Sequence, residues 1–357
     1  MINSAKKAED MKKLAAYRKT LHESPVLRNL FLELTLRCNQ NCIHCGSRCG
    51  EVRSEELTFE QYRVFLDKIK KDFGTEKKML CITGGEPLLR PDFYEIMEYA
   101  NSLGFNWGMT SNAILIDDAA AEKLRKCGMK TISVSIDGLE ETHNALRRSK
   151  DGYERAMNGI NALIRNGGFR SVQVTTVVNH SNIHELEELY AIFDKMDIDS
   201  WRILNIEPIG RALDHSELTL TKEDYRYMFG FIRDKRIAGE PVTYGCSHYL
   251  GRKYEREVRD WYFLCNAGIY TASIAANGDI LACLDIERRP ELIQGNILRD
   301  DFTHVWQNGF RAYRRDLCDL NEKCRSCSEK EFCTGGAYHS WNFDNNEPMV
   351  CFKDVLF

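Results

Sequence analysis

The sequence predicts an α/β fold followed by a small cysteine-rich region, and three observations support this. From residue 30 to about residue 236, apolar runs typical of strands alternate with helical patterns. The alternation ends near residue 240. The cysteines gather toward the two ends of the chain, with eight of the 14 from Cys246 onward. Six consecutive β–α units predict a parallel sheet with helices outside it, either open or curled into a partial barrel.

The elements follow one another regularly along the chain. A polar, lysine-rich start predicts a helix from Ala8 to Leu21. Thr58 and Gln61 have the spacing of a capping box, which marks the start of a helix. Strands are expected at 30–36, 78–83, 106–111, 131–136, 171–178 and 201–207, and helices at 58–72, 91–103, 117–127, 152–166, 183–196 and 221–236.

Composition excludes several classes of function. The 357 residues carry a formal net charge of −4, which offers no basic surface for nucleic acid. No apolar run approaches the ~18 residues that span a bilayer, so we expect no membrane partner. The N-terminus has no apolar signal core, which favours a cytoplasmic protein. In such a chain, cysteine-rich segments indicate metal ligation more than disulfides.

The strongest motif is a cysteine triplet that directly follows the first predicted strand. Cys38, Cys42 and Cys45 are separated by three and two residues. Three thiolates can hold three irons of a [4Fe–4S] cube and leave the fourth iron open for a substrate or cofactor. The spacing favours an irregular loop, because on one helix Cys38 and Cys45 would lie ~10 Å apart along the axis. The triplet alone leaves a zinc site or buried structural cysteines as alternatives.

Several polar or glycine-containing motifs occupy equivalent places in successive β–α units. Cys38, Gly84, Ser111, Asp137 and Glu207 each stand at or just beyond the C-terminal end of a predicted strand. The C-terminal ends of parallel strands meet at one edge of a sheet or barrel, where such folds carry their active sites. The sequence therefore predicts one shared pocket.

With the triplet and Gly84-Gly85-Glu86-Pro87 after the second strand, the chain resembles the radical S-adenosylmethionine (SAM) enzymes over roughly residues 30–235. It resembles their SPASM subgroup over roughly residues 245–357. The resemblance implies a partial (β/α)6 barrel followed by a small cysteine-rich SPASM domain with auxiliary iron–sulfur clusters. The expected organisation is an N-terminal helical extension at 1–29, the barrel at 30–238 and the SPASM domain at 239–357.

The resemblance also implies how SAM is held. Gly84 and Gly85 would let the backbone approach a ligand closely, and Glu86 would accept from the methionine ammonium. For each residue there is a plain alternative, such as a turn, a helix cap or a solvated arginine. Cys49 is expected to be a nearby free thiol, since a fourth thiolate would close the iron that SAM needs. The expected SAM-binding residues are His44, Gly84, Gly85, Glu86, Ser111, Ser135, Asp137 and Arg147.

The C-terminal cysteines resemble the SPASM pattern with one departure. Cys265 and Cys283 fit its first part, on either side of an Asn277-Gly278 hairpin turn. Ala337 stands where the family has a cysteine that serves the proximal cluster, so Cys318, or else Cys246, is the expected substitute. Without a substitute, the proximal cluster would have an open iron that could bind substrate. Zinc is the alternative for Cys324 and Cys327. With the SAM-binding cube, three [4Fe–4S] clusters are expected; the distal auxiliary cluster would use Cys324, Cys327, Cys333 and Cys351.

The resemblance favours a peptide-modifying enzyme. The expected reaction starts with a 5′-deoxyadenosyl radical that abstracts a hydrogen atom from a ribosomally made precursor peptide. A carbon–carbon, ether or thioether cross-link, an oxidised residue and an epimerised residue remain open as products. The 29 residues before the first strand are too few for a winged-helix domain, so a separate leader-binding protein or direct recognition by the barrel is expected. A flavodoxin or ferredoxin donor and an anaerobic cytoplasm are implied.

Three other functions remain as alternatives. A small-molecule radical enzyme would oxidise or epimerise a sugar or alcohol, and a free Cys246 could return a hydrogen atom to its substrate radical. An anaerobic sulfatase maturase would carry an aspartate at Leu284; here the aspartate is Asp285, which on a strand would point to the other face. A non-catalytic iron–sulfur electron carrier would need neither an open iron nor the Gly84–Glu86 motif.

Overall fold

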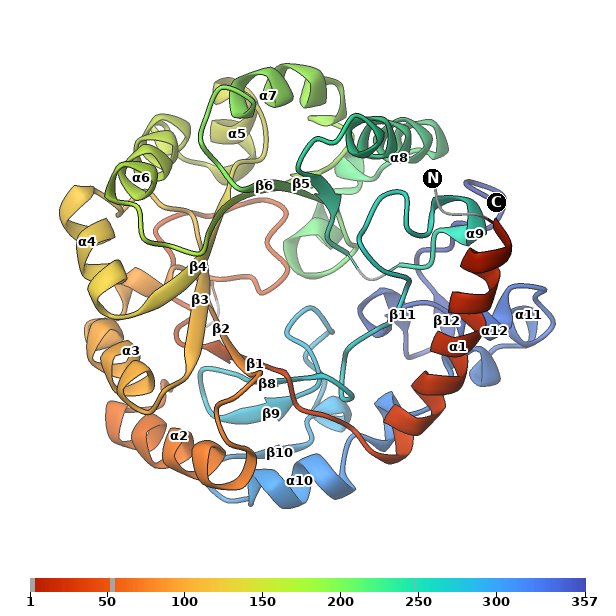
Figure 1. Ribbon diagram of the computed structural model, residues 1–357, viewed down its shortest axis with the longest axis horizontal. Helices are drawn as coiled ribbons and strands as arrows, with labels where there is room; N and C mark the ends of the chain where they lie inside the picture. Colours follow the sequence, from red (N-terminus) through yellow and green to blue (C-terminus); the bar gives the residue numbers. More distant parts are fainter. Residues whose placement is uncertain (1–3, 52–54, 247) are drawn as a thin grey trace.

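The computed structural model describes residues 4–51, 55–246 and 248–357. Seen down its short axis, the chain forms an arc of strands with a layer of helices outside it (Figure 1). Six parallel strands lie side by side in chain order, as the alternation predicted. They are β1 (Asn29–Glu33), β2 (Met79–Thr83), β3 (Asn106–Ser111), β4 (Met129–Ser135), β5 (Ser171–Val178) and β6 (Ser200–Asn205).

Amphipathic helices follow the strands and bury their apolar faces against the outside of the sheet. The capping box of Thr58 and Gln61 forms as expected. The helices are α2 (Phe59–Phe73), α3 (Phe93–Ser102), α4 (Asp118–Lys126), α6 (Gly152–Asn166), α7 (Leu186–Phe193) and α8 (Lys222–Ile237). An additional helix, α5 (Glu140–Arg147), was not expected from the sequence; it is short, and its N-cap residue Leu139 makes no side-chain cap.

The sheet continues beyond the six expected strands at both edges. Strand β7 (Val242–Tyr244) pairs parallel with β6, and β8 (Thr271–Ile274) pairs parallel with β1. The hairpin partner β9 (Asp279–Leu281) and β10 (Gly295–Asn296) complete a ten-stranded sheet within the described residues. The outermost strands β10 and β7 are not neighbours in its strand order, so the barrel is partial. The C-terminal region is therefore joined to the barrel by backbone hydrogen bonds.

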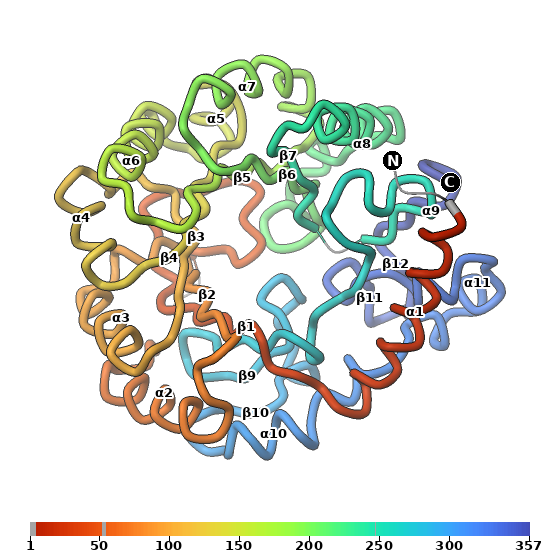
Figure 2. The backbone as a smooth tube through the Cα atoms, in the orientation of Figure 1, coloured from red at the N-terminus to blue at the C-terminus, as the bar shows by residue number. Residues whose placement is uncertain are grey.

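The N-terminal helix α1 (Ser4–Glu23) is longer than expected and lies along the C-terminal region (Figure 2). Its Arg18 donates to the carbonyl of Glu331 at 3.0 Å, beside the short helix α12 (Lys330–Cys333). Its Lys7 pairs with Glu257 at 3.3 Å. Among the described residues, no helix combines the length and the apolar character that crossing a bilayer requires.

Candidate functional site

The cysteine triplet lies in an irregular loop at the C-terminal end of β1, as its spacing predicted. The thiols of Cys38, Cys42 and Cys45 are close enough to act on one another electrostatically. Burial raises the pKa of Cys42 to about 12, so a bound iron would have to replace its proton. The loop thus presents a convergent set of three sulfur ligands.

The barrel itself holds this loop in place. The Arg211 guanidinium donates to the carbonyl of Cys42 at 2.7 Å and to that of Cys49 at 3.1 Å. The backbone of Arg211 donates to the carbonyl of Cys45 at 3.0 Å. Gly210 has a positive φ of 57°, and a Cβ there would lie 2.4 Å from the Cys45 carbonyl oxygen. The segment after β6 therefore positions the triplet, a role that the sequence did not reveal.

Gly84 and Gly85 approach the chain's own cysteine loop. A Cβ on Gly84 would lie 2.3 Å from the carbonyl oxygen of Thr35, and one on Gly85 would lie 2.1 Å from that of Arg37. The backbone of Gly85 donates to Thr35 and that of Glu86 donates to Arg37, at 2.8 and 2.9 Å. The glycines are thus required for packing the turn after β2 against the start of the cysteine loop.

Glu86 is fully buried at the end of β2 and bonded to the end of β3. Its carboxylate accepts from the Ser111 hydroxyl at 3.0 Å and from the backbone of Asn112 at 2.9 Å. Burial raises the pKa of Glu86 to about 7. The Asn112 side chain in turn donates to Asn39 in the cysteine loop at 2.7 Å. The structure therefore brings Glu86 and Ser111 together beside the triplet.

His44, Asp137 and Arg147 form a second buried group. Arg147 Nη2 lies 2.6 Å and His44 Nε2 lies 3.1 Å from Asp137 Oδ2. Burial alone would raise the pKa of Asp137, but the charges of Arg147 and His44 outweigh it and hold that pKa well below its usual range. Arg147 also donates to Gln40 at 3.1 Å. Ser135 is the last residue of β4 and is half-buried.

Cys49 is buried next to the triplet. A hydrogen bond from its thiol lowers the pKa of Cys45 to about 5, and the same bond together with burial raises the pKa of Cys49. Cys49 thus lies within reach of Cys45 while its carbonyl is held by Arg211.

Four of the C-terminal cysteines surround a hollow. Cys324, Cys327, Cys333 and Cys351 line a common cavity, and their thiols act on one another electrostatically. Four thiols that line one cavity fit the sulfur ligands of an iron–sulfur cluster. This is the set expected for the distal cluster.

The other C-terminal cysteines lie in three places. Cys265 and Cys283 lie close together, because Cys265 raises the pKa of Cys283 and both act on the pKa of Tyr313. Cys318 instead lies toward the distal group, where Cys324 and Arg18 are among its charged neighbours. Cys246 lies near Glu207 and Asp285, and its thiol is 4.0 Å from the Asn205 carbonyl.

Asp285 does not lie on a strand. Strand β9 ends at Leu281, and the turn that follows directs Asp285 back toward Cys283, with Oδ2 3.8 Å from Sγ. Its charge also acts on Arg202 and His339. The expectation that a one-residue shift from Leu284 turns Asp285 to the other face assumed a strand at this point, and the strand ends before it.

Two comparisons identify the family. Residues 32–192 match the model of the radical SAM superfamily, and residues 265–328 match that of the SPASM iron–sulfur cluster-binding domain. The chain is a radical SAM enzyme with a SPASM domain. The radical SAM match spans β1 through most of α7, including the triplet and the groups around Glu86 and Asp137. The SPASM match includes Cys265, Cys283, Cys324 and Cys327.

Relatives of this radical SAM enzyme carry different names. The chain is 28% identical over 322 residues to an AdoMet-dependent heme synthase of Methanosarcina barkeri, covering 85% of this chain and 89% of that protein. It is 29% identical over 309 residues to the mycofactocin maturase MftC of Mycolicibacterium smegmatis, covering 85% and 76%.

Solved structures share the fold. Streptococcus suis SuiB bound to its precursor peptide SuiA aligns with a TM-score of 0.68 at 19% identity, over 91% of this chain and 74% of that one. Native anSMEcpe with bound AdoMet aligns with a TM-score of 0.67 at 17% identity, over 87% and 89%. These likenesses support the partial barrel and its C-terminal extension.

The radical SAM site fits its cofactors chemically. The triplet offers three sulfur ligands and no fourth from its own motif. Two polar atoms at the site, His44 Nδ1 and Gln40 Nε2, are buried and have no hydrogen-bond partner among the described residues. A buried polar atom is normally satisfied, so these two are available to a bound nucleotide.

Proposed function

We propose that this enzyme abstracts a hydrogen atom from a precursor peptide and so starts a cross-link, an oxidation or an epimerisation. The observation that carries the proposal is the three-cysteine loop fixed at the C-terminal mouth of the barrel by Arg211 and the Gly84-Gly85 turn. The peptide class is supported by the maturase name of one relative and by the precursor peptide bound to SuiB.

Three cluster sites are proposed, of which the triplet and the distal group are the better defined. When bound, the cube on the triplet and SAM would supply a 5′-deoxyadenosyl radical. His44, Gly84, Gly85, Glu86, Ser111, Ser135, Asp137 and Arg147 are proposed to hold or position SAM. Glu86 would accept from its ammonium group, and Asp137 would keep Arg147 and His44 oriented. A reduced flavodoxin or ferredoxin is the proposed electron donor.

Arg202 is the proposed contact for a substrate carboxylate inside the barrel. Its neighbour Trp201 packs on Phe193 and Phe231 of the outer helices, so Arg202 points to the opposite face, the inside. It donates to the hydroxyls of Ser133 and Thr175 at 3.1 and 3.3 Å and forms no ion pair with a described residue. An unpaired guanidinium suits the C-terminal carboxylate or an acidic side chain of a peptide.

The proposal is tested with the reduced, anaerobic enzyme. SAM and a short peptide encoded beside the gene are added, and 5′-deoxyadenosine and the mass and stereochemistry of the peptide are measured. The expected result is 5′-deoxyadenosine formation with a matching change in the peptide, both absent in Cys42→Ala. Formation of 5′-deoxyadenosine with no change in any encoded peptide would contradict the peptide class.

A tetrapyrrole is the second candidate substrate. It is favoured by heme synthase relatives that match over 85–92% of this chain. An iron porphyrin with carboxylate side chains also has a group that Arg202 could bind. Under the same conditions, a change in the mass of the porphyrin and none in the peptide would select this function.

A further inference from the structure

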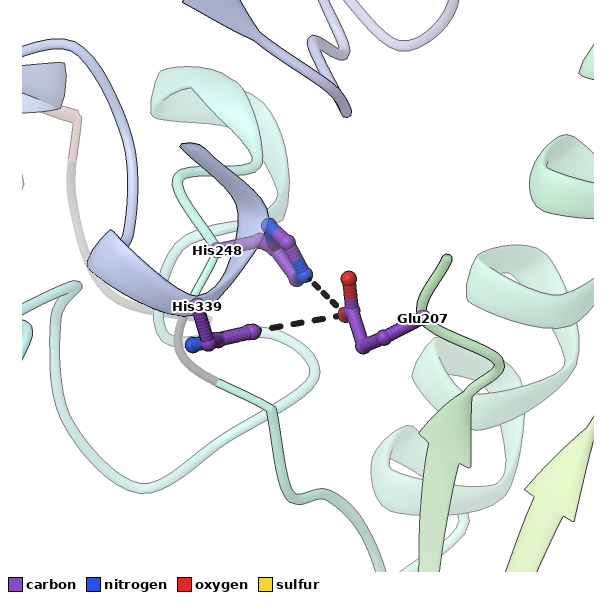
Figure 3. A group of neighbouring side chains, drawn as sticks. All are labelled: Glu207, His248 and His339. Atoms are coloured by element: carbon purple, nitrogen blue, oxygen red, sulfur yellow. Dashed lines mark hydrogen bonds and ion pairs between the residues drawn. The ribbon is translucent and has the colours of Figure 1, made fainter. Parts of the chain in front are cut away.

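Three side chains of metal-binding type meet where the barrel contacts the SPASM domain. Glu207 follows β6, His248 lies in the loop after β7, and His339 lies in the short 3-10 helix Tyr338–Ser340 (Figure 3). Glu207 Oε1 is 2.5 Å from His248 Nε2 and 3.5 Å from His339 Nε2. One ligand atom from each residue lies within 4.8 Å of the other two. Such spacing brings all three within reach of a single ion.

The three side chains of this group are almost completely shielded from solvent. The side chains of Glu207, His248 and His339 expose 11%, 2% and 11% of their surface. The second carboxylate oxygen, Glu207 Oε2, is buried and has no hydrogen-bond partner among the described residues. A buried acceptor without a partner costs ~1–3 kcal/mol, and more when it is charged. A cation beside the carboxylate would satisfy this oxygen, whereas the two imidazoles reach only Oε1.

The charges around the group also suit a cation. Burial alone would raise the pKa of Glu207, but the two imidazoles hold it below its usual range, so the carboxylate is ionised. Burial alone would lower the pKa of His339, but Glu207 and, to a smaller extent, Asp285 raise it, so negative charge gathers around this group.

We propose that Glu207, His248 and His339 bind one divalent first-row transition-metal ion, separate from the iron–sulfur clusters. Two imidazoles and one carboxylate are the ligand set of three-ligand zinc sites and of non-heme iron(II) sites. No thiol belongs to the set, which distinguishes it from the cysteine groups. Three protein ligands leave at least one coordination position for water or substrate.

The ion would join three parts of the chain. Its ligands come from the end of the barrel, the loop after β7 and the SPASM segment that begins at Ala337. Ala337 stands where the family has a cluster-binding cysteine. This segment therefore lacks the bond to a cluster that a cysteine at that position would form. The backbone of Tyr338 donates to Cys265, and His339 reaches Glu207. Metal binding at His339 would therefore fix this segment to the barrel mouth.

The test uses the anaerobically reconstituted holoenzyme and zinc as the probe. One equivalent of Zn²⁺ is added, loose metal is removed, and zinc and iron are counted together by mass spectrometry. We expect about one zinc per chain in the wild type. His339→Gln and Glu207→Gln should each retain less than a tenth of that zinc with an unchanged iron content. His180→Gln, at an exposed histidine paired with Asp224, is the matched control and should retain the zinc.

Zinc X-ray absorption on the wild type decides the ligand set even if a variant folds poorly. We expect a shell of nitrogen and oxygen with imidazole scattering and no sulfur. Sulfur ligands would place the zinc on the cysteines and overturn the proposal. So would the absence of zinc from the wild type, which would make the group a proton-sharing network, or zinc retained by both variants.

Discussion

The two well-defined cysteine groups of this enzyme are held in different ways. The triplet after β1 is fixed by backbone bonds from Arg211 and by the close approach of Gly84 and Gly85. In the distal group, Cys324 lies on the short helix α11 (Glu322–Arg325) and Cys333 on α12, Cys351 is exposed, and all four cysteines line one cavity. The barrel thus shapes the first site by itself, and we propose that the second region instead requires a bound cluster to complete its core.

The largest expected effect is a loss of activity without a loss of stability when a cysteine of the triplet is replaced. Cys38→Ala should abolish SAM cleavage, because two thiolates do not hold the cube with one open iron. The barrel should keep its thermal stability, since the loop is held by other groups. Measurement of 5′-deoxyadenosine and of the melting temperature checks this. Cys127→Ala, a buried thiol bonded to Glu98, is the control and should keep its activity.

The distal group should show the opposite behaviour. Cys333→Ala should lose the iron of one cluster. Residues 317–357 should then become more accessible to protease and to hydrogen exchange, because the cluster would no longer occupy the cavity. SAM cleavage without substrate should remain within a few-fold of the wild type. An unchanged exchange pattern after the loss of iron would show that this region folds without its cluster.

Features that depend on local sequence patterns could be predicted, whereas features that depend on contacts between distant segments could not. The six strands follow from local patterns, and Cys38, Glu86, Ser111 and Asp137 lie near one another at the strand ends. The pairing of β8 with β1 was not predictable, because strands of three or four residues carry little pattern and their partners are remote in the chain. The hydrogen bonds from Arg211 to the cysteine loop likewise depend on contacts between distant segments.

A substitution at Gly85 tests how strongly its close approach to the cysteine loop fixes the triplet. Gly85→Ala would place a Cβ 2.1 Å from the carbonyl oxygen of Arg37 and 3.0 Å from Cys38 Cβ. The loop must shift, and we expect roughly tenfold weaker SAM binding, about 1.4 kcal/mol, with a lower melting temperature. Titration calorimetry and thermal unfolding measure both. Gly230→Ala in α8, where a Cβ meets nothing within 4 Å, should leave SAM binding unchanged.

The smallest expected effect is a dependence of SAM affinity on pH. The pKa of Glu86 is raised to about 7, and its carboxylate form is the one that accepts from an ammonium. As pH falls below about 7, the carboxyl gains a proton, so wild-type affinity should fall about tenfold per pH unit. Glu86→Gln should bind SAM weakly and show no such slope. An equal slope in the variant would assign the titration to another group.

The account rests on an open coordination position at the cube of the first cysteine group. Electron paramagnetic resonance of the reduced enzyme, with and without SAM carrying ¹⁵N in its amino group, tests this directly. We predict that SAM shifts the signal of the cube and adds a ¹⁵N coupling, and that Cys38→Ala shows neither. A cube present in the wild type whose signal is unchanged by SAM would contradict the account.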